Sequence, residues 1–313
     1  MSSYAKLVPV PALKNILFPT DFSPPAQAIL PFVRSLAERY GSTIHVLHVL
    51  APEPMLEIPL DSVSELDADR DAAQSAMRTL LASKGFRGVA HTATVKRGPL
   101  WKVLETFIEQ NSIDLIVLAT HGRRGLVKLV LGSVAEQVFR LARSPVLTLG
   151  PKALHEGAAD ASFARILFAT DFSSGSQRAL EYALRFTRAN NSHLILLHAI
   201  SASMEVVPDN FDNVGTAALK VSDEFIADTL ASSRRQVAEL ISDEVMQEFN
   251  PEIIVECGPA VETILRVAEN KRADLIVMGA HRAPMSSIVT HLPWATASAV
   301  VCQAHCPTLT VRS

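Results

Sequence analysis

The chain has 313 residues, a formal net charge of −3 at pH 7 and a hydrophobic content of 48%. This length predicts two domains, each able to bury its own core, and the charge excludes a protein whose affinity rests on neutralising many nucleic-acid phosphates. No apolar run reaches the roughly 18 residues of a membrane-spanning helix, and residues 1–15 lack the long apolar segment of a secretory signal. We therefore expect a cytoplasmic protein that binds neither nucleic acid nor a membrane.

One sequence pattern occurs twice in the chain. Asn15–Ser23, NILFPTDFS, returns 150 residues later as Arg165–Ser173, RILFATDFS. Asp114–Val117 returns 160 residues later as Asp274–Val277, so the second copy has gained ten residues between these points. Matches in the same order indicate a tandem duplication.

Short apolar runs alternate with helical patterns in each copy. In the first copy, strands are expected at 16–18, 44–50, 89–95, 115–118 and 146–149. Apolar residues at spacings of three and four predict a helix after Ser23 that ends at Gly41. Further helices are expected before Gly85, after Pro99 and after Gly132.

Strands that alternate with helices imply parallel pairing, right-handed crossovers and helices on both faces of the sheet. Each copy is therefore expected to be an α/β three-layer sandwich, with domains at 1–150 and 164–313. The polar segment 150–163 is expected to be an irregular linker, and 51–69 and 201–223 are expected to be long surface connections.

The stretch Asp114–Ser133 runs an apolar strand into a basic, glycine-containing loop. Glycine allows backbone N–H groups to approach a phosphate, and the helix that Gly132 and Ser133 open favours negative charge at its N-terminus. His121 and Arg123 place cationic groups in the same loop. The pattern favours a phosphate-binding loop, while a plain strand-to-helix connection with a capped helix stays open.

Ligands of open α/β sheets lie outside the carboxyl ends of the strands, where the strand order reverses. This rule gathers Pro19, Thr20 and Asp21 after the first strand, Val49 in the second, and Ala119 at the end of the fourth. Asp21 is placed to accept a hydrogen bond from a ribose hydroxyl or an adenine amino group. The alternative is a helix N-cap or a turn residue.

The three cysteines, Cys257, Cys302 and Cys306, all lie in the second copy and form no disulfide framework. The spacing of Cys302 and Cys306 suits zinc, but no second pair of ligands is evident nearby. We expect both to be buried thiols, and we assign no metal site.

The spacing Ala119-x2-Gly122-x9-Gly132-Ser133 resembles the G-x2-G-x9-G-[ST] nucleotide motif of the universal stress protein family, with alanine in place of the first glycine. The resemblance extends to TDFS after the first strand and to LGSVAEQV at 131–138, and it covers nearly the entire chain.

The resemblance implies two tandem Rossmann-like, flavodoxin-like domains, each with a five-stranded parallel sheet of order 3-2-1-4-5. It also implies an intramolecular pseudo-dimer in which strand 146–149 pairs with 308–311. A further homodimer stays open.

The resemblance also implies an adenine-nucleotide site in the first copy, holding ATP alone or with Mg²⁺. Asp21 and the Val49 backbone would face the adenine and ribose. The residues implied for the phosphate side are Gly122, Arg123, Gly132, Ser133 and Val134. For His121, a phosphate contact and a solvent-facing position are both open.

The second copy departs from this motif. Gly279–Arg282 keeps the start of the loop, but Leu292 and Pro293 stand where the motif has Gly-Ser, and another register places Trp294 opposite Gly132. Either register removes the glycine, and proline also removes a backbone donor. We therefore expect the first copy to bind nucleotide and the second not to bind it in the same manner.

The loop 119–133 contains neither Asp nor Glu, and the chain has no G-x4-G-K-[ST] motif. An ATP-using enzyme needs a base and a metal-holding carboxylate near the phosphates. We therefore favour a stress-response sensor or regulator with at most weak ATP hydrolysis, and we assign no catalytic residue. A slow ATPase or other ATP-using enzyme stays open, as does a scaffold without nucleotide, which Ala119 supports best.

Overall fold

The structure is a computed structural model that describes residues 13–52, 60–120, 133–155, 160–200, 223–280 and 293–312. The strands of the first copy are β1 (Asn15–Pro19), β2 (Thr43–Leu50), β3 (His91–Arg97), β4 (Leu115–Ala119) and β5 (Val146–Leu149). Those of the second copy are β6 (Arg165–Thr170), β7 (His193–Ile200), β8 (Glu252–Cys257), β9 (Leu275–Ala280) and β10 (Thr308–Arg312).

The helices of the first copy are α1 (Pro24–Ala28), α2 (Leu30–Tyr40), α3 (Leu60–Leu81), the 3-10 helix η1 (Lys84–Phe86), α4 (Leu100–Gln110), α5 (Ser133–Leu141) and α6 (Pro151–His155). Those of the second copy are α7 (Ser174–Asn190), α8 (Asp223–Ala238), α9 (Asp243–Phe249), α10 (Ala260–Asn270) and α11 (Pro293–Gln303). Within the described segments, none of these helices has both the length and the hydropathy needed to cross a lipid bilayer.

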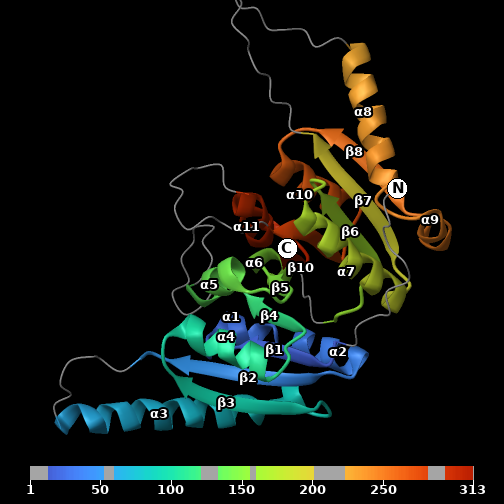
Figure 1. Cartoon of the computed structure of the whole chain (residues 1–313). Helices are drawn as coiled ribbons and strands as arrows, with labels where there is room; N and C mark the ends of the chain where they lie inside the picture. The colour runs from blue at the N-terminus through green and yellow to red at the C-terminus, as the bar shows by residue number, and fades with distance from the viewer. Residues whose placement is uncertain are drawn as a thin grey trace, which may run out of the picture.

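The described strands form one continuous sheet of order β3-β2-β1-β4-β5-β10-β9-β6-β7-β8. Each copy contributes a parallel sheet of order 3-2-1-4-5, which confirms the predicted fold class. The two copies join where β5 pairs antiparallel with β10, with Leu147 opposite Leu309. Figure 1 shows this junction in the middle of the molecule, with α3 at one end and α8 at the other.

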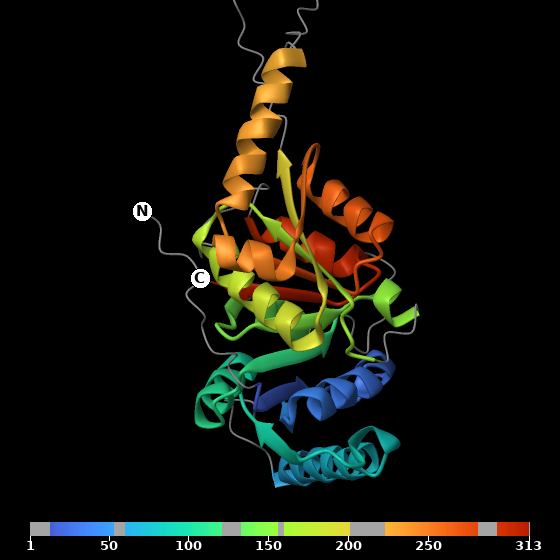
Figure 2. The ribbon, with the colours of Figure 1, turned by 90° about the vertical axis from the view of Figure 1, so that its right-hand side faces the viewer.

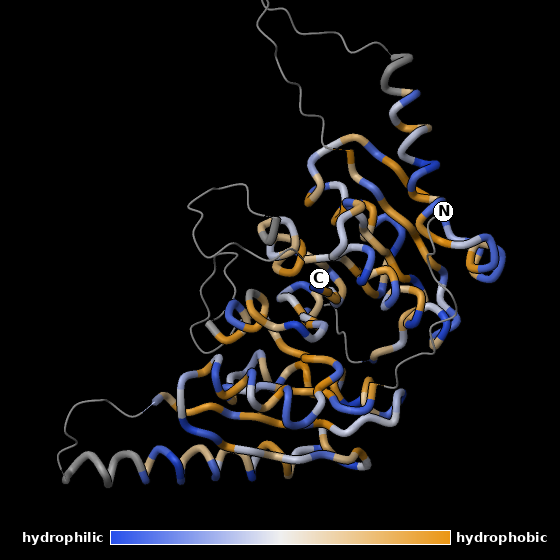
Figure 3. The backbone as a smooth tube through the Cα atoms, in the orientation of Figure 1, coloured by the Kyte–Doolittle hydropathy of each residue, from blue (hydrophilic) through white to orange (hydrophobic). Residues whose placement is uncertain are grey.

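Two core layers cover the two faces of this sheet. Successive residues of a strand point to opposite faces, so Ile16 and Phe18 enter one layer and Leu17 enters the other, all fully buried. Helices α2, α3 and α7 pack on the first layer, and α4, α5, α10 and α11 pack on the second. Both layers contain side chains of both copies. The apolar strands run through the interior between these helices (Figures 2 and 3).

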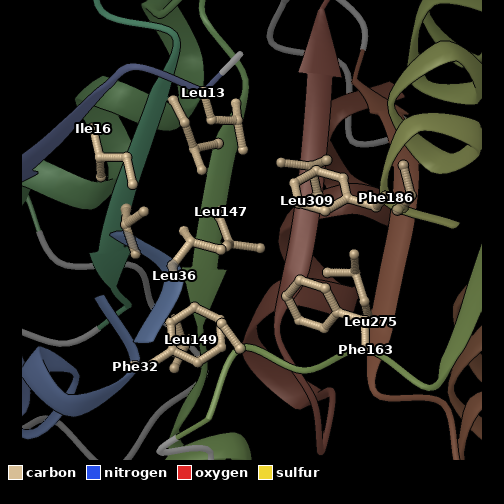
Figure 4. Close-up of a cluster of buried hydrophobic side chains, with 14 of the residues drawn as sticks. Leu13, Ile16, Phe32, Leu36, Leu147, Leu149, Phe163, Phe186, Leu275 and Leu309 are labelled. Atoms are coloured by element: carbon tan, nitrogen blue, oxygen red, sulfur yellow. The ribbon is translucent and has the colours of Figure 1, made fainter. Parts of the chain in front are cut away.

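An aromatic cluster joins the two copies on the first layer. The ring of Phe186 in α7 lies edge-on to Tyr40 of α2, with centroids 5.7 Å apart, and edge-on to Phe163 at 5.6 Å. Phe163 also lies 6.3 Å from Phe32 of α2. Figure 4 shows the rings of Phe32, Phe163 and Phe186 around the leucines of β5 and β10. Edge-to-face pairs add to the stabilisation that burial provides, so the junction resembles a domain core more than a loose contact between domains.

The segment between the copies is ordered where the structure describes it. The prediction of an irregular linker over 150–163 was wrong at α6, which begins directly after Gly150. A Cβ at Gly150 would lie 2.6 Å from the Val301 carbonyl oxygen, so only glycine lets the chain pass this close to α11. Ser35 of α2 donates to the Asp160 carboxylate at 2.6 Å, and this bond is the main cause that lowers the pKa of Asp160 below its ordinary value.

Two predicted helices also differ from those observed. The helix expected after Ser23 is divided into α1 and α2, because Pro31 has no N–H to donate to the Gln27 carbonyl one turn earlier. The prediction of a surface connection up to Asp69 is wrong from Leu60 onward, where α3 begins. Residues 67–72 of α3 are exposed, so no buried stripe marked this part of the helix in the sequence.

The aromatic cluster predicts a large cost for truncation at the junction. Phe186→Ala should lower the free energy of unfolding by about 3–5 kcal/mol, because it leaves a cavity between α2 and α7. Leu141→Ala is the control, since Leu141 is 42% exposed and should cost about 0.5 kcal/mol or less. Chemical denaturation of the full chain measures both values. Equal costs for the two variants would contradict the role assigned to the cluster.

Candidate functional site

The strand order reverses at β1, which lies between β2 and β4. Pro19 pairs with Leu47 of β2, and Leu17 pairs with Ile116 of β4. The carboxyl end of β1 therefore lies between the carboxyl ends of its two neighbours. It is followed directly by Thr20 and Asp21, so the first part of the predicted site lies at the reversal point.

Asp21 closes the turn after β1. Its Oδ1 accepts a hydrogen bond from the Ser23 backbone N–H at 3.0 Å. Ser23, and not Asp21, is the N-cap of α1, because its Oγ accepts from the Ala26 N–H. The sequence left two structural roles open for Asp21, a helix N-cap and a turn residue. The structure shows the turn residue. Asp21 is half-buried.

Thr20 and Phe22 give this turn a fixed shape. The Thr20 N–H donates to the Leu47 carbonyl at 2.9 Å, and Thr20 Oγ1 accepts from the Phe22 N–H at 3.0 Å. Phe22 has a φ of 60°, a conformation that is unfavourable for a bulky residue and persists only where the surroundings impose it. Its ring lies 4.5 Å from that of His48, whose Nδ1 lies 2.7 Å from the Thr20 carbonyl oxygen.

The same turn occurs in the second copy. Phe172 has a φ of 62°, and its ring lies 4.5 Å from that of His198. His198 Nδ1 lies 2.9 Å from the Thr170 carbonyl oxygen, and Asp171 accepts from the Ser173 N–H at 3.0 Å. The nucleoside side of the candidate site is thus built twice. Sequence reasoning did not single out Phe22, although it belongs to the repeated TDFS.

Val49 and Gly98 lie at the carboxyl end of β2, the strand that pairs with β1. Val49 is half-buried and pairs with Lys96 of β3. The Gly98 N–H donates to the Leu50 carbonyl at 3.1 Å, and its φ of 148° suits glycine. Gly98 was not among the predicted site residues, but the structure places it beside the carboxyl end of β2.

The phosphate side of the predicted site is described only at its two ends. Ala119 ends β4, pairs with Leu149 and is half-buried. Ser133 begins α5, and Val134 packs against the second core layer. The predicted site residues that lie outside the described residues are His121, Gly122, Arg123 and Gly132.

The residue of the second copy that corresponds to Ala119 is Gly279, and the space around it explains why it is a glycine. A Cβ at Gly279 would lie 2.4 Å from the Ser176 nitrogen and 2.6 Å from the Gly175 carbonyl carbon. Gly279 therefore lets the first turn of α7 pack directly on β9. This contact indicates that the glycine serves helix packing in the second copy, and Ala119 need not mark the loss of a ligand contact in the first.

The helices that follow the two loops show which residues correspond. Val146 pairs with Ile116, and Thr308 pairs with the equivalent Ile276, so Val146 and Thr308 hold the same place in the two sheets. The buried residues of α5, Ala135, Val138 and Phe139, return at the same offset as the buried Ala297, Val300 and Val301 of α11. This arrangement favours the register with Trp294 opposite Gly132 over the one with Leu292 there.

The cysteines behave as ordinary buried thiols in two of three cases. Cys302 and Cys306 are buried, as predicted, whereas Cys257 is exposed. Burial raises the pKa of the Cys302 thiol above its ordinary value, which disfavours the thiolate that binds metals. Among the described residues, no three His, Cys, Asp or Glu side chains gather into a metal-binding group.

Comparison with known proteins shows the same duplicated organisation. The universal stress protein family matches residues 12–149 and again residues 162–312. The universal stress protein Slr1230 of Synechocystis is 27% identical over 327 residues, which cover 96% of this chain and 100% of that protein.

Solved structures share the fold along the whole chain. A universal stress protein from Archaeoglobus fulgidus superposes with a TM-score of 0.64 at 20% identity, covering 95% of this chain and 98% of its own. A universal stress protein solved in complex with cAMP matches 48% of this chain, with a TM-score of 0.31 at 21% identity. Since the family matches both halves of a chain whose sheet repeats the order 3-2-1-4-5, the protein belongs to the universal stress protein family as a tandem member.

Proposed function

We propose that this chain is an adenine-nucleotide sensor or regulator of a stress response, which binds ATP in its first copy and has lost that binding mode in its second. The observation that carries the proposal is the difference between two otherwise matching sites. Both copies hold the same Thr-Asp-Phe-Ser turn at the strand reversal point, but Trp294 of the second copy stands at the position of Gly132 in the first. The proposal includes domains at 1–150 and 164–313.

The nucleoside would lie at the ends of β1 and β2. The Asp21 carboxylate would accept from the ribose or the adenine, and the Val49 backbone would bond the base. The fixed turn at Phe22 supports this proposal, because strained backbone persists where the surrounding structure imposes it and gathers at functional sites. The turn restricts Asp21 before a ligand arrives, which reduces the entropy lost on binding.

The triphosphate would extend from Ala119 toward the start of α5. The loop cations and the residues from Gly132 to Val134 would bond its oxygens, as helix N-termini do. Mg²⁺, if it accompanies ATP, fits as an ion held by phosphate oxygens and water, because the loop 119–133 supplies no carboxylate. The lack of a carboxylate in this loop also favours a sensor over an enzyme.

Asp21 and Asp171 offer a matched pair of variants. Asp21→Asn keeps the oxygen that closes the turn but removes the negative charge, so ATP should bind about tenfold more weakly or worse. Asp171→Asn makes the same change in the second copy and should leave the affinity unchanged. Isothermal titration of ATP into the full chain measures both. Equal losses of affinity in the two variants, or a loss confined to Asp171→Asn, would contradict a site in the first copy.

The correspondence of the two copies allows the phosphate side to be tested by exchange. Gly132→Trp gives the first copy the residue that the second has at this position, and should reduce ATP affinity at least about tenfold. The fold should persist, because the second copy carries this tryptophan and still pairs β9 with β10. Pro293→Ser is the control and should not alter the affinity. If Gly132→Trp binds ATP like the natural chain at an unchanged melting temperature, the phosphate side lies elsewhere.

Nucleotide persistence separates the sensor from the alternatives. Freshly purified protein should release intact ATP on denaturation, and its phosphate release should be far slower than the roughly 10 turnovers per second of a median enzyme. Mass spectrometry identifies the nucleotide, and a timed phosphate assay follows hydrolysis. Rapid turnover would replace the sensor with an ATP-using enzyme, and a chain that neither carries nor binds nucleotide would be a scaffold.

A further inference from the structure

A cavity of about 290 Å³ lies at the boundary between the two copies. Its walls come from α2 and the segments that precede β1, β4 and β5 in the first copy, and from α7 in the second. It therefore opens near the amino ends of the central strands, away from the carboxyl ends where the nucleotide is proposed to bind. Leu13 and Phe186, which line it, lie on the two sides of the β5–β10 pair (Figure 4).

Arg185 supplies a cation with unused hydrogen-bonding capacity. Its side chain is only 14% exposed, and its guanidinium carbon lies 5.2 Å from the centre of the Tyr182 ring. Its one carboxylate neighbour among the described residues, Glu181, lies 3.8 Å away, which is long for a charged hydrogen bond. Arg185 Nε is buried and has no hydrogen-bond partner in the described part of the chain. A buried donor left without a partner destabilises the folded chain.

The charge balance of the cavity favours an anion. Arg143 lines it together with Arg185, while Asp114 is the one carboxylate among the described residues of the wall. Asp114 Oδ2 already accepts from the backbone N–H groups of Lys14 and Asn15, at 2.8 and 2.9 Å. The negative charge is thus engaged by the main chain, and two guanidinium groups remain for a ligand.

Aromatic rings supply the apolar part of the wall. Tyr40, Tyr182 and Phe186 all line the cavity, and the Tyr40 hydroxyl accepts from Asn190 Nδ2 at 2.9 Å. Planar rings prefer offset or edge-on contact with such side chains. A few polar groups set into an apolar wall are typical of small-molecule sites.

We propose that this cavity binds a small aromatic carboxylate, whose ring packs against Tyr182 and Phe186 and whose anionic group is bonded by Arg185 and Arg143. The ligand would touch both copies and bond the guanidinium groups that line the cavity. It would therefore bind across the junction and stabilise the folded chain by mass action. The inference is independent of nucleotide binding, since none of the proposed nucleotide residues that the structure describes lines the cavity.

The test uses the full chain and a matched pair of probes, 2-naphthoate and its neutral isostere 2-naphthamide, in calorimetric titrations. The carboxylate should bind at one site per chain and at least about tenfold more tightly than the amide, because a charge-assisted bond is the stronger one. Arg185→Met should reduce the affinity for 2-naphthoate about tenfold or more and leave the amide little changed. Arg87→Met alters an exposed arginine outside the cavity and should change neither.

Three results would overturn the inference: no carboxylate binding at about 1 mM, equal affinity for the two probes, or unchanged 2-naphthoate binding by Arg185→Met. If Arg185→Met does not fold, Arg143→Met replaces it, because Arg143 is exposed and should fold normally. ATP affinity should be the same in all of these variants. This readout distinguishes failure of the cavity site from failure of the proposed nucleotide site.

Discussion

The antiparallel pairing of β5 with β10 is the contact on which the whole molecule depends. It converts two parallel sheets, each with an exposed edge, into one sheet whose central edges are both covered. Unpaired strand edges favour association with other chains, and here each copy covers the edge of the other. Because the two core layers then run through both copies, Phe186 of the second copy packs directly against Tyr40 of the first. The copies are thus held together by core packing as well as by backbone hydrogen bonds.

The two copies have the same turn where the strand order of each sheet reverses, but their structures differ beyond this turn. The turns at Asp21 and Asp171 match in hydrogen bonding, in the positive φ of the following phenylalanine and in the histidine contact. Beyond the turn, Gly279 lets α7 pack closely on β9, and α11 begins with a proline. An anion site depends on free backbone donors, and we propose that the differences beyond the turn separate the two copies in nucleotide binding.

The fold and the place of part of the candidate site were predictable from the sequence, for physical reasons that can be named. Buried parallel strands are apolar throughout, so their positions were predicted closely, and the repeat placed Thr20 and Asp21 at a strand end. The early part of α3 was missed because residues 67–72 are exposed and carry no buried stripe. The break before α2 was missed because the apolar spacing continues across Pro31, although its missing N–H ends the helix.

The sequence by itself determined the duplication, the alternation of strands and helices, and the residues that reach the carboxyl edge, because these follow from local periodicity and from matches along the chain. The tertiary structure decided which groups meet across the junction. Arg143 and Arg185 share one cavity only because β5 pairs with β10 and thereby brings α7 against α2. Periodicity reports which side of an element is buried, but the partner of a buried or half-buried group depends on contacts between residues far apart in the chain.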